Sequence, residues 1–271
     1  MEQVNLLGET KYDALLNGYY QDRQIRLNGK ELSFVPSSLW EIPTKNKYLK
    51  ALIEDENEIR EVKRTGGALG EKGLKFSEFK PNVAERVIEF WSNEGDLIID
   101  PFAGRATRAM VATILNRHYL GYEIVPSYRD FIMERISTLP EEMKSRVEIR
   151  LGDGCELKGL VNNIADLIFS CPPYWNLEKY ASGDGQLSDY LNYADFIKRI
   201  DTALRSSYRV LKRNCFLCWV VADWFLDGKF YPFHKDVMNL AEETGFQLHD
   251  VVIIKVYSMF VSVSAGISYL T

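Results

Sequence analysis

Cysteine and histidine are scarce in this sequence. Its 271 residues include four cysteines and three histidines, and no second Cys or His pair lies at ligand spacing from Cys215 and Cys218. That pair falls in an apolar stretch typical of a strand, where residues three apart face opposite sides. We therefore expect buried structural thiols rather than a zinc site, with no metal and no disulfides.

Long apolar runs are also absent. No stretch approaches the roughly 18 apolar residues that a membrane span needs, and the N-terminus lacks the basic and apolar parts of a signal peptide. Apolar residues still make up 46% of the chain, which is enough for one large core with an appendage. These features predict a globular, cytoplasmic protein without a membrane partner.

An excess of positive charge is missing as well. The net charge of −5 argues against a protein that coats nucleic acid nonspecifically, because clustered Lys and Arg drive phosphate binding. A local cationic track remains possible, formed by Lys45, Lys47, Lys50, Arg60, Lys63, Arg64, Lys72 and Lys75. Acidic residues at 54–61 are interspersed, so the same stretch is equally typical of a solvated surface.

Residues 1–75 predict an accessory region. Asn28-Gly29 between apolar stretches at 24–27 and 30–34 is the strongest short hairpin signal. A helix is expected near 45–58. The Gly-rich stretch 65–73 is interpreted as a mobile flap rather than a linker, because basic residues flank it and it directly precedes the motifs below.

Helical and strand patterns alternate over residues 76–271. Helices are expected at 82–92, 106–116, 126–138, 192–212 and 232–243, and strands at 96–100, 118–123, 147–151, 165–170, 215–222 and 246–256. Such alternation predicts an α/β fold with a doubly wound, mostly parallel sheet covered by helices on both faces. A final segment at 259–270 is expected to complete the sheet as an antiparallel strand.

A glycine turn follows the first of these strands, at Asp-Pro-Phe-Ala-Gly (100–104). Gly104 allows close backbone approach, and the helix after it offers unpaired N–H groups and the positive end of its dipole to a polar cofactor. Glu123 ends the next strand, where an acidic residue can bind ribose hydroxyls. Asp153 follows the third strand. A plain surface carboxylate for Glu123 and a local turn role for Asp153 remain alternatives.

A rigid turn, Cys-Pro-Pro-Tyr at 171–174, ends the fourth strand. Two prolines fix φ and carry no N–H groups, so the turn's carbonyls are free acceptors beside the ring of Tyr174. The turn therefore suits a flat base with an exocyclic amino group. Ligands of such sheets bind beyond the carboxyl ends of the strands, and Asp100, Glu123, Asp153, Cys171 and Asp223 all fall there.

Together the two motifs resemble those of the S-adenosylmethionine-dependent amino-methyltransferases of DNA, which methylate adenine N6 or cytosine N4. Residues 79–88 are similar to the helix-opening motif of these enzymes, and 171–180 resemble phage and plasmid-borne methylases with Cys-Pro-Pro-Tyr. The resemblance covers residues 76–257, and more loosely 35–59. It implies a Rossmann-like, seven-stranded methyltransferase sheet over 76–271, S-adenosylmethionine as cofactor and double-stranded DNA as substrate, as in restriction-modification systems or phages.

The resemblance also implies a set of site residues. The catalytic set is Ser170, Cys171, Pro172, Pro173 and Tyr174, and the cofactor set is Phe79, Pro81, Asp100, Phe102, Ala103, Gly104, Thr107, Glu123, Asp153 and Ser170. The carbonyl of Pro172 and the residue before it would accept the two amino hydrogens, which localises the nitrogen lone pair for attack on the methyl group. Tyr174 would stack on a base flipped out of the duplex.

Three positions depart from the family pattern. Cys171 stands where most relatives have Asp, Asn or Ser, so Ser170, a backbone carbonyl or water takes the acceptor role, or the base is held differently. Alternatively, a Cys171 thiolate attacks pyrimidine C6, which requires a cation that the neighbouring Asp166 and Glu178 do not supply. Arg105-Ala106 replaces a second Gly, which a right-handed backbone tolerates. The last strand is also altered.

Three functions follow from these observations. The leading one is DNA amino-methylation, with cytosine N4 slightly favoured over adenine N6 because Ser-Pro-Pro-Tyr is commoner in that subgroup. An RNA base methyltransferase is the second, although residues 1–75 carry no aromatic RNA-binding signature. A non-catalytic DNA-binding relative is the third. Trp175 and Tyr180 suit either the core or a target contact, and the choice between monomer and homodimer stays open.

Overall fold

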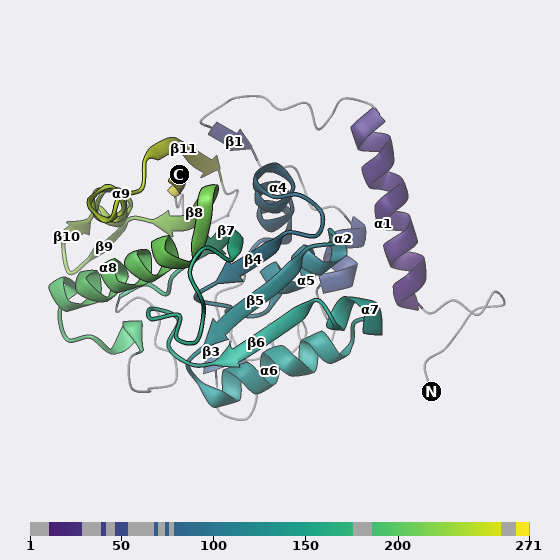
Figure 1. Ribbon diagram of the computed structural model, residues 1–271, viewed down its shortest axis with the longest axis horizontal. Coiled ribbons are helices and arrows are strands. Elements are labelled where there is room, and N and C mark those ends of the chain that lie inside the picture. The colour runs from purple at the N-terminus through teal and green to yellow at the C-terminus, as the bar shows by residue number, and fades with distance from the viewer. Residues whose placement is uncertain are drawn as a thin grey trace.

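One large sheet organises the protein in the computed structural model, which describes residues 11–28, 39–41, 47–53, 68–69, 74–75, 79–175, 186–255 and 264–270. Its strands lie in the order β1-β11-β12-β8-β7-β4-β5-β6 (Figure 1). Their bounds are β1 Leu39–Glu41, β4 Leu97–Asp100, β5 His118–Glu123, β6 Val147–Leu151, β7 Ala165–Ser170, β8 Leu211–Ala222, β11 Leu248–Lys255 and β12 Ser264–Leu270.

The sheet is doubly wound and mostly parallel, as predicted. Strands β6, β5, β4, β7 and β8 form a contiguous parallel block, whereas β12 runs antiparallel to both β8 and β11. The predicted number of seven strands is wrong, because β1 pairs in parallel with β11 and makes an eighth. Three residues are too few for a hydrophobic alternation to reveal a strand.

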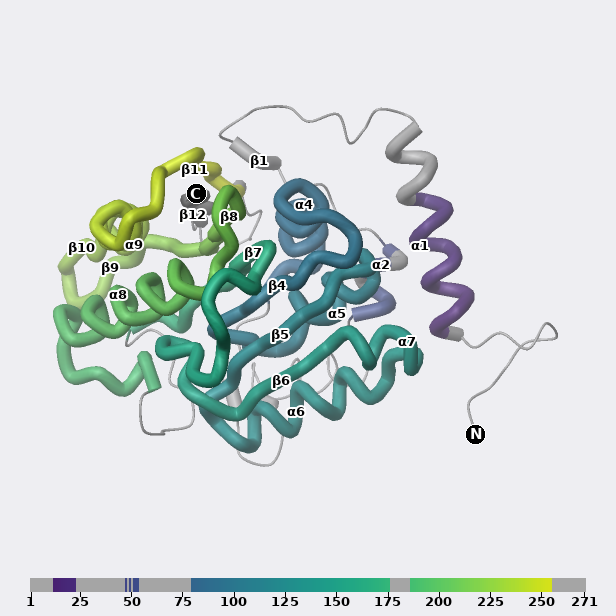
Figure 2. Tube along the Cα trace, in the orientation of Figure 1, coloured from purple at the N-terminus to yellow at the C-terminus, as the bar shows by residue number. Residues whose placement is uncertain are grey.

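Helices cover both faces of the sheet. Their bounds are α1 Lys11–Asn28, α2 Lys47–Ile53, α4 Pro81–Trp91, α5 Thr107–Ile114, α6 Pro126–Ser137, α7 Glu141–Lys144, α8 Tyr193–Val210 and α9 Phe233–Thr244. One core cluster holds buried residues of α2, α4, α5 and α6, and the second holds those of α8 and α9. Figure 2 shows α8 and α9 together at one end of the molecule, with α1 at the other.

Each strand contributes alternately to the two cores, because neighbouring side chains on a strand face opposite sides. Ile98, Tyr119 and Leu167 face the first core, whereas Ile99, Leu120 and Ile168 face the second. The period of two therefore places every second residue of the parallel block against each layer of helices. It also fixes the register in which the strand ends meet.

The predicted hairpin at 24–34 is wrong in its first strand, since Gln24 to Asn28 are the last turn of α1. Gln, Arg and Leu are good helix formers, and a Gly after an Asn ends a helix as readily as it turns a hairpin. Residues 29–34 lie outside the described ranges. So does most of the predicted flap at 65–73. Its described part, β2 (Ala68–Leu69), pairs antiparallel with β3 (Leu74–Lys75), which follows the flap.

The described N-terminal helices pack on the helices that cover the central sheet. Tyr19 of α1 is fully buried and donates to Glu85 Oε1 of α4 at 2.7 Å, and Tyr20 donates to the Ile114 carbonyl at 2.6 Å. Leu49 and Ile53 of α2 lie in the same core. These contacts put α1 and α2 in one folded unit with α4 and α5.

The cysteines of the described ranges are free thiols. Cys218 lies in the first core and Cys215 packs against the second, so the two face opposite sides of β8 as predicted. Burial raises the pKa of both thiols. Among the described residues, no group of three or more His, Cys, Asp or Glu is placed to hold a metal ion, and no helix is long and apolar enough to cross a membrane.

Candidate active site

The glycine loop and the Pro-Pro-Tyr turn leave adjacent strands at the same edge of the sheet. Strands β4 and β7 are parallel neighbours, with Ile98 opposite Leu167 and Ile99 opposite Ile168. Because parallel strands end at a common edge, the loop after Asp100 and the turn after Ser170 lie side by side. The structure thus brings together two motifs separated by about seventy residues of sequence.

Asp100 joins these two segments through four hydrogen bonds. Its carboxylate is fully buried and accepts from the backbone N–H of Phe102 at 3.0 Å, Ser170 Oγ at 2.5 Å, Arg108 Nε at 2.5 Å and Tyr119 Oη at 2.6 Å. The four donors come from the glycine loop, β7, α5 and β5. Asp100 therefore organises the carboxyl edge from inside the protein.

Arg108 is the buried partner of Asp100, and the sequence analysis did not identify it. Its guanidinium also donates to the Phe102 carbonyl at 2.5 Å and lies over the Phe79 ring, 4.8 Å from the centroid. Burial is the largest single influence on the pKa of Arg108 and lowers it. The charges of Asp100, Tyr119 and Cys171 and the hydrogen bond to Asp100 together outweigh burial, so the net shift of the pKa is upward. The sequence signal for such a pair was a charged residue, Arg108, in the first turn of a helix whose other residues are apolar or small. A charge on a buried helix needs a partner of opposite charge.

The electrostatic surroundings of Cys171 differ from the prediction. The charge of Arg108 interacts with Cys171, so the acidic neighbours in the sequence are not the only charges near the thiol. Arg108 comes from a helix 63 positions upstream, which local inspection of the turn does not reveal. Its charge is nevertheless compensated by the ion pair with Asp100 at 2.5 Å, which limits its capacity to stabilise a thiolate.

Two residues of the glycine loop have left-handed backbone conformations. Gly104 has φ 60° and Ala106, the N-cap residue of α5, has φ 63°. A right-handed backbone, the condition under which the extra methyl group is tolerated, is therefore not met at Ala106. Relatives with Gly at this position avoid the steric cost of a Cβ there. The loop is anchored by the Ala103 N–H, which donates to the Tyr122 carbonyl at 3.0 Å, and leads into buried Thr107.

The loops at this edge approach one another too closely for side chains. A Cβ on Gly154 would lie 1.7 Å from the Pro101 carbonyl oxygen, and one on Gly121 would lie 2.9 Å from the Cβ of Ala103. Both contacts are shorter than carbon atoms allow. These glycines therefore let the backbone after β6 and the strand β5 pack directly on the glycine loop.

Glu123 ends β5 and is partly buried. One carboxylate oxygen accepts the Val125 N–H at 2.9 Å. Burial raises the pKa of Glu123 to about 7; hydrogen bonds from the backbone of Val125 and Ile124 oppose this shift, and the charge of Asp100 adds to it. A partly desolvated carboxylate at a strand end is suited to a hydroxyl ligand that replaces the lost water.

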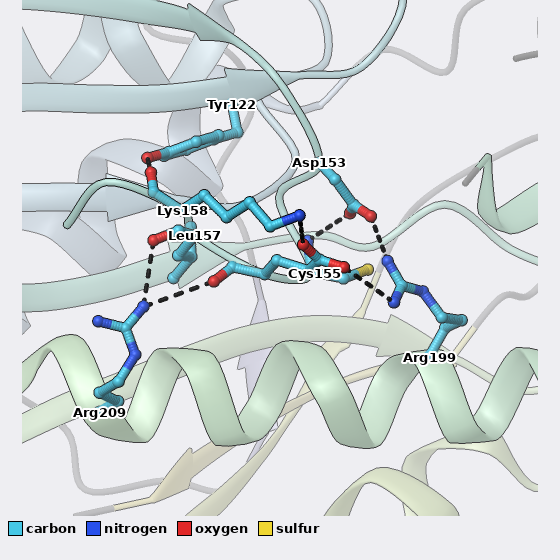
Figure 3. Close-up of polar contacts among 8 residues, drawn as sticks. Tyr122, Asp153, Cys155, Leu157, Lys158, Arg199 and Arg209 are labelled. Atoms are coloured by element: carbon cyan, nitrogen blue, oxygen red, sulfur yellow. Dashed lines mark hydrogen bonds and ion pairs between the residues drawn. The ribbon is translucent and has the colours of Figure 1, made fainter. Parts of the chain in front are cut away.

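Asp153 is held from two directions (Figure 3). Its Oδ1 accepts the Cys155 N–H at 2.9 Å, which is the local turn bond considered above, and its Oδ2 pairs with Arg199 of α8. Arg199 also lies 3.8 Å from Glu156 Oε1. Asp153 thus has a structural role at the turn and a fixed orientation set by α8.

A second arginine of α8 supports the same segment. Arg209 donates to the carbonyls of Leu160 at 2.7 Å and Leu157 at 3.1 Å. Tyr122 at the end of β5 donates to the Lys158 carbonyl at 2.8 Å (Figure 3). Residues 153–160 are therefore fixed between the sheet edge and α8 without forming a helix of their own.

The Pro-Pro-Tyr turn rests on an aromatic cluster. The ring of Tyr174 meets Trp224 edge-on at 5.7 Å and Phe233 at 6.2 Å. Trp175 is 9% exposed, donates its indole N–H to the Tyr190 carbonyl at 2.8 Å and packs on Tyr231. Trp175 is therefore a core residue. Tyr180 lies outside the described residues.

A small hairpin that was not predicted from the sequence belongs to this cluster. Strands β9 (Trp224–Leu226) and β10 (Lys229–Tyr231) pair antiparallel around Asp227 and Gly228, which have φ 50° and 75°. An Asp-Gly dipeptide between aromatic residues is the sequence signal that identifies such a turn. Just before the hairpin, Asp223 accepts from His234 Nδ1 at 2.6 Å and from the His234 N–H at 3.1 Å, and so fixes the start of α9.

Comparison with solved structures supports the fold. The geranyl diphosphate C-methyltransferase of Streptomyces coelicolor superposes with a TM-score of 0.50 at 10% sequence identity, covering 75% of this chain and 88% of that protein. At this identity the likeness concerns the fold alone. It shows that the sheet and its helices share the fold of that protein.

Sequence comparisons show similarity to DNA methyltransferases. Residues 8–134 match the sequence model of the DNA methylase family of N6 and N4 methyltransferases. The orphan methyltransferase M.BamHII of Bacillus amyloliquefaciens is 47% identical over 58 residues (21% of this chain, 22% of that protein), and the type II methyltransferase M.BglII of Bacillus subtilis is 30% identical over 87 residues (32% and 24%). The chain thus matches about a quarter of the length of these relatives. These matches make the chain similar to the N6 and N4 DNA methylases over part of its length.

Proposed function

We propose that this protein transfers a methyl group from S-adenosylmethionine to the exocyclic amino nitrogen of cytosine or adenine in double-stranded DNA. The hydrogen bond between Ser170 and Asp100, 2.5 Å long, is the observation that carries the proposal. It fixes the predicted base-binding turn directly beside the predicted cofactor loop. Transfer of a methyl group requires its donor and acceptor to be held within contact distance in a defined orientation.

The residues at the carboxyl edge fit S-adenosylmethionine. Gly104, with its left-handed backbone, leaves room for a ligand beside the backbone before α5, since a Cβ there would meet no atom closer than 3.8 Å. Glu123 would offer a carboxylate to the ribose hydroxyls. Asp153, oriented by Arg199, would accept a hydrogen bond from the adenine amino group. When bound, the cofactor supplies a methyl group activated by its sulfonium.

Phe79 and Pro81 complete this half from the start of α4. The Phe79 ring meets Phe169 edge-on at 5.7 Å and lies against the Arg108 guanidinium, and Pro81 is the first residue of α4. Phe79 is only partly buried, so it retains a surface for the methionine part of the cofactor. We assign Asp100 and Ser170 to positioning these elements rather than to contact, since both are fully buried.

The turn at 171–174 supplies the target half. The Pro172 carbonyl accepts one amino hydrogen, and the backbone carbonyl of Cys171 or a water accepts the other, because a thiol is a weak acceptor. Tyr174 provides a ring face for the flipped base. As the nitrogen forms its bond to the methyl carbon, the bond from that carbon to the sulfonium sulfur would break and leave a neutral thioether, and the nitrogen would release one proton to solvent.

The direct test is incubation with labelled S-adenosylmethionine and unmethylated DNA, followed by digestion to nucleosides and mass spectrometry. We expect N4-methylcytosine or N6-methyladenine, with cytosine favoured. RNA oligonucleotides run in parallel should stay unlabelled. If diverse DNA yields neither methylated base while the protein is folded, the proposal fails.

The variant Cys171→Ser decides between amino methylation and a covalent mechanism. Serine is a better acceptor than cysteine, so amino methylation should survive or increase, whereas attack on pyrimidine C6 needs the thiolate and should vanish. Product identity provides a second readout, because the covalent route yields 5-methylcytosine. An inactive Cys171→Ser variant that still binds cofactor and DNA would exclude our assignment.

A further inference from the structure

The β9–β10 hairpin has two aromatic faces with opposite environments. Trp224 and Tyr231 are register partners, stack with centroids 5.7 Å apart, and are 7% and 8% exposed. The next pair, Phe225 and Phe230, points to the other face, since side chains alternate along a strand. Phe225 is 72% exposed and Phe230 46%, with their rings 4.9 Å apart.

The inward face of the hairpin adjoins the catalytic turn. Trp224 meets the ring of Tyr174 at 5.7 Å, and Tyr231 contacts Tyr193 at 4.9 Å and Trp175 at 5.3 Å. The hairpin follows β8 directly, at the carboxyl edge of the sheet, beside α9 (Figure 1). Phe225 and Phe230 therefore lie on the outer rim of the predicted base-binding half.

The turn holds the outward pair in place. Asp227 and Gly228 both have positive φ, 50° and 75°, as a two-residue hairpin turn matching the twist of the strands requires. Lys229 Nζ lies 5.0 Å from the centroid of the Tyr231 ring, which brings one positive charge to the rim beside the negative charge of Asp227. Anchored by Trp224 and Tyr231, the hairpin presents its outer rings in a fixed geometry.

Two exposed, paired phenylalanines on a rigid support are costly in water, so they suggest a partner with flat apolar faces. DNA from which a base has been flipped offers such faces, because the bases on either side of the gap lose their stacking neighbour. Phenylalanine rings replace that stacking without reading sequence.

We propose that Phe225 and Phe230 stack on the DNA bases that flank the flipped target, and so stabilise the gap while Tyr174 holds the target itself. This inference rests on the proposed function. It assigns the hairpin to binding the remaining duplex rather than to binding cofactor. A second copy of the chain is the competing partner for the same face, and the experiment below distinguishes the two.

The test compares the wild type with the double variants Phe225→Ala/Phe230→Ala and Phe225→Leu/Phe230→Leu. Leucine keeps the apolar character but lacks a flat ring. DNA affinity is measured by fluorescence anisotropy on a labelled, unmethylated duplex that contains the sequence methylated by the wild type. Cofactor affinity is measured by calorimetry. We expect both double variants, which lose two ring contacts, to bind DNA at least about thirtyfold more weakly with unchanged cofactor affinity, and Phe225→Trp to bind normally.

Val161→Ala provides the matched control. Val161 is 68% exposed and precedes β7. It therefore lies toward the amino ends of the parallel strands, away from the candidate site, and its truncation should change neither the DNA affinity nor the cofactor affinity. Circular dichroism confirms that all variants are folded. Equal DNA affinity of the wild type and the alanine double variant overturns the proposal, and full affinity of the leucine variant overturns stacking as its cause.

Oligomeric state gives a separate outcome. If the wild type sediments as a dimer and the alanine double variant as a monomer with intact DNA affinity, the face is an interface between copies and the proposal fails. The proposed function is judged independently by methyl transfer from the wild type. Wild-type methylation of DNA with unaltered binding by the variants refutes the hairpin alone, whereas a wild type that neither binds nor methylates DNA refutes both.

Discussion

The cofactor half of the candidate site is built from buried polar bonds, and the target half from packed rings. In the first, the Asp100 carboxylate alone accepts from four donors, and glycines hold the loops in contact. In the second, Tyr174 and Trp175 rest on Trp224, Tyr231 and Phe233. The structure of the first half thus depends on the two oxygens of one carboxylate, whereas that of the second depends on many ring contacts, each of which contributes a small part.

This difference predicts how each half responds to mutation. Removal of one member of a buried ion pair leaves the other member buried without a counter-charge. The desolvation cost of that remaining charge then lowers the free energy of unfolding. Loss of one ring from a cluster removes a contact that neighbouring rings partly restore. Substitutions in the cofactor half should therefore unfold the protein, whereas those in the target half should mainly affect DNA.

Asp100→Ala should have the largest effect. It leaves the Arg108 guanidinium, 4% exposed, without its counter-charge, and we expect a loss of about 3–5 kcal/mol in the free energy of unfolding. Urea denaturation measures the loss. Glu141→Ala is the control, since the pair of Glu141 with Lys144 is at the surface and should contribute less than about 1 kcal/mol. An Asp100→Ala protein of normal stability that fails only to bind cofactor would show direct contact instead.

Gly154→Ala should be the next most damaging. Its Cβ would lie 1.7 Å from the Pro101 carbonyl oxygen, so the loop has to move, at a cost of about 1–3 kcal/mol. Cofactor affinity, measured by calorimetry, should fall with the displacement of Asp153. Gly152→Ala is the matched control two residues away, because a Cβ there meets only Tyr122 at 3.7 Å. Equal behaviour of the two variants would contradict the close packing of the loops.

Tyr174→Ala should spare the cofactor half. We expect unchanged cofactor affinity, loss of most turnover, and DNA binding weaker by about 1–3 kcal/mol through lost stacking. The ring contacts with Trp224 and Phe233 also contribute to folding, so Tyr174→Phe, which keeps them, separates the two effects. Loss of cofactor binding in Tyr174→Ala would indicate that the halves are not independent.

Glu123→Gln should change the pH dependence rather than the fold. The pKa of Glu123 is raised from 4.5 to about 7 in the folded protein, so its contribution to stability is fully present below the unfolded pKa and is lost as the pH rises through 7. The variant should therefore be more stable than the wild type at pH 8, by roughly 1–2 kcal/mol, and equal to it near pH 4.

Cofactor binding should show the opposite trend for the same residue. The ionised carboxylate is the better acceptor for ribose hydroxyls, so wild-type affinity should rise as the pH increases through 7, whereas that of Glu123→Gln should stay flat. Calorimetry at pH 6, 7 and 8 measures both. Parallel pH profiles in the two proteins would remove Glu123 from the cofactor site.

Ala106→Gly should have the smallest effect. Glycine relieves about 1–2 kcal/mol of strain at φ 63°, but it costs about 0.5–1 kcal/mol in backbone entropy and loses a buried methyl group. The net change should stay below about 1 kcal/mol. Ala109→Gly on the same helix, where no strain is relieved, should cost about 2 kcal/mol. Similar losses at both positions would contradict the left-handed conformation.

The contrast between the halves also explains what the sequence allowed us to predict. The parallel block was predictable because hydrophobic alternation and punctuating glycines are local, and both motifs lie directly after their strands. The network of Asp100 was not, because its partners Arg108, Tyr119 and Ser170 lie on three other elements. The aromatic cluster was not predicted for the same reason, because its rings, among them Trp175, Tyr193 and Tyr231, come from segments that are distant in the sequence.

The central position of β12 has a consequence for the order of folding. Strands β1 and β11 reach the sheet only through β12, which lies between β11 and β8. The segment Leu39–Glu41 can therefore join the sheet only after β11, which contains its partner Ile253, and residues 264–270 have been synthesised. Pairings so distant in sequence form slowly, so the β1 edge should be the last part of the sheet to assemble, well after the parallel block has formed.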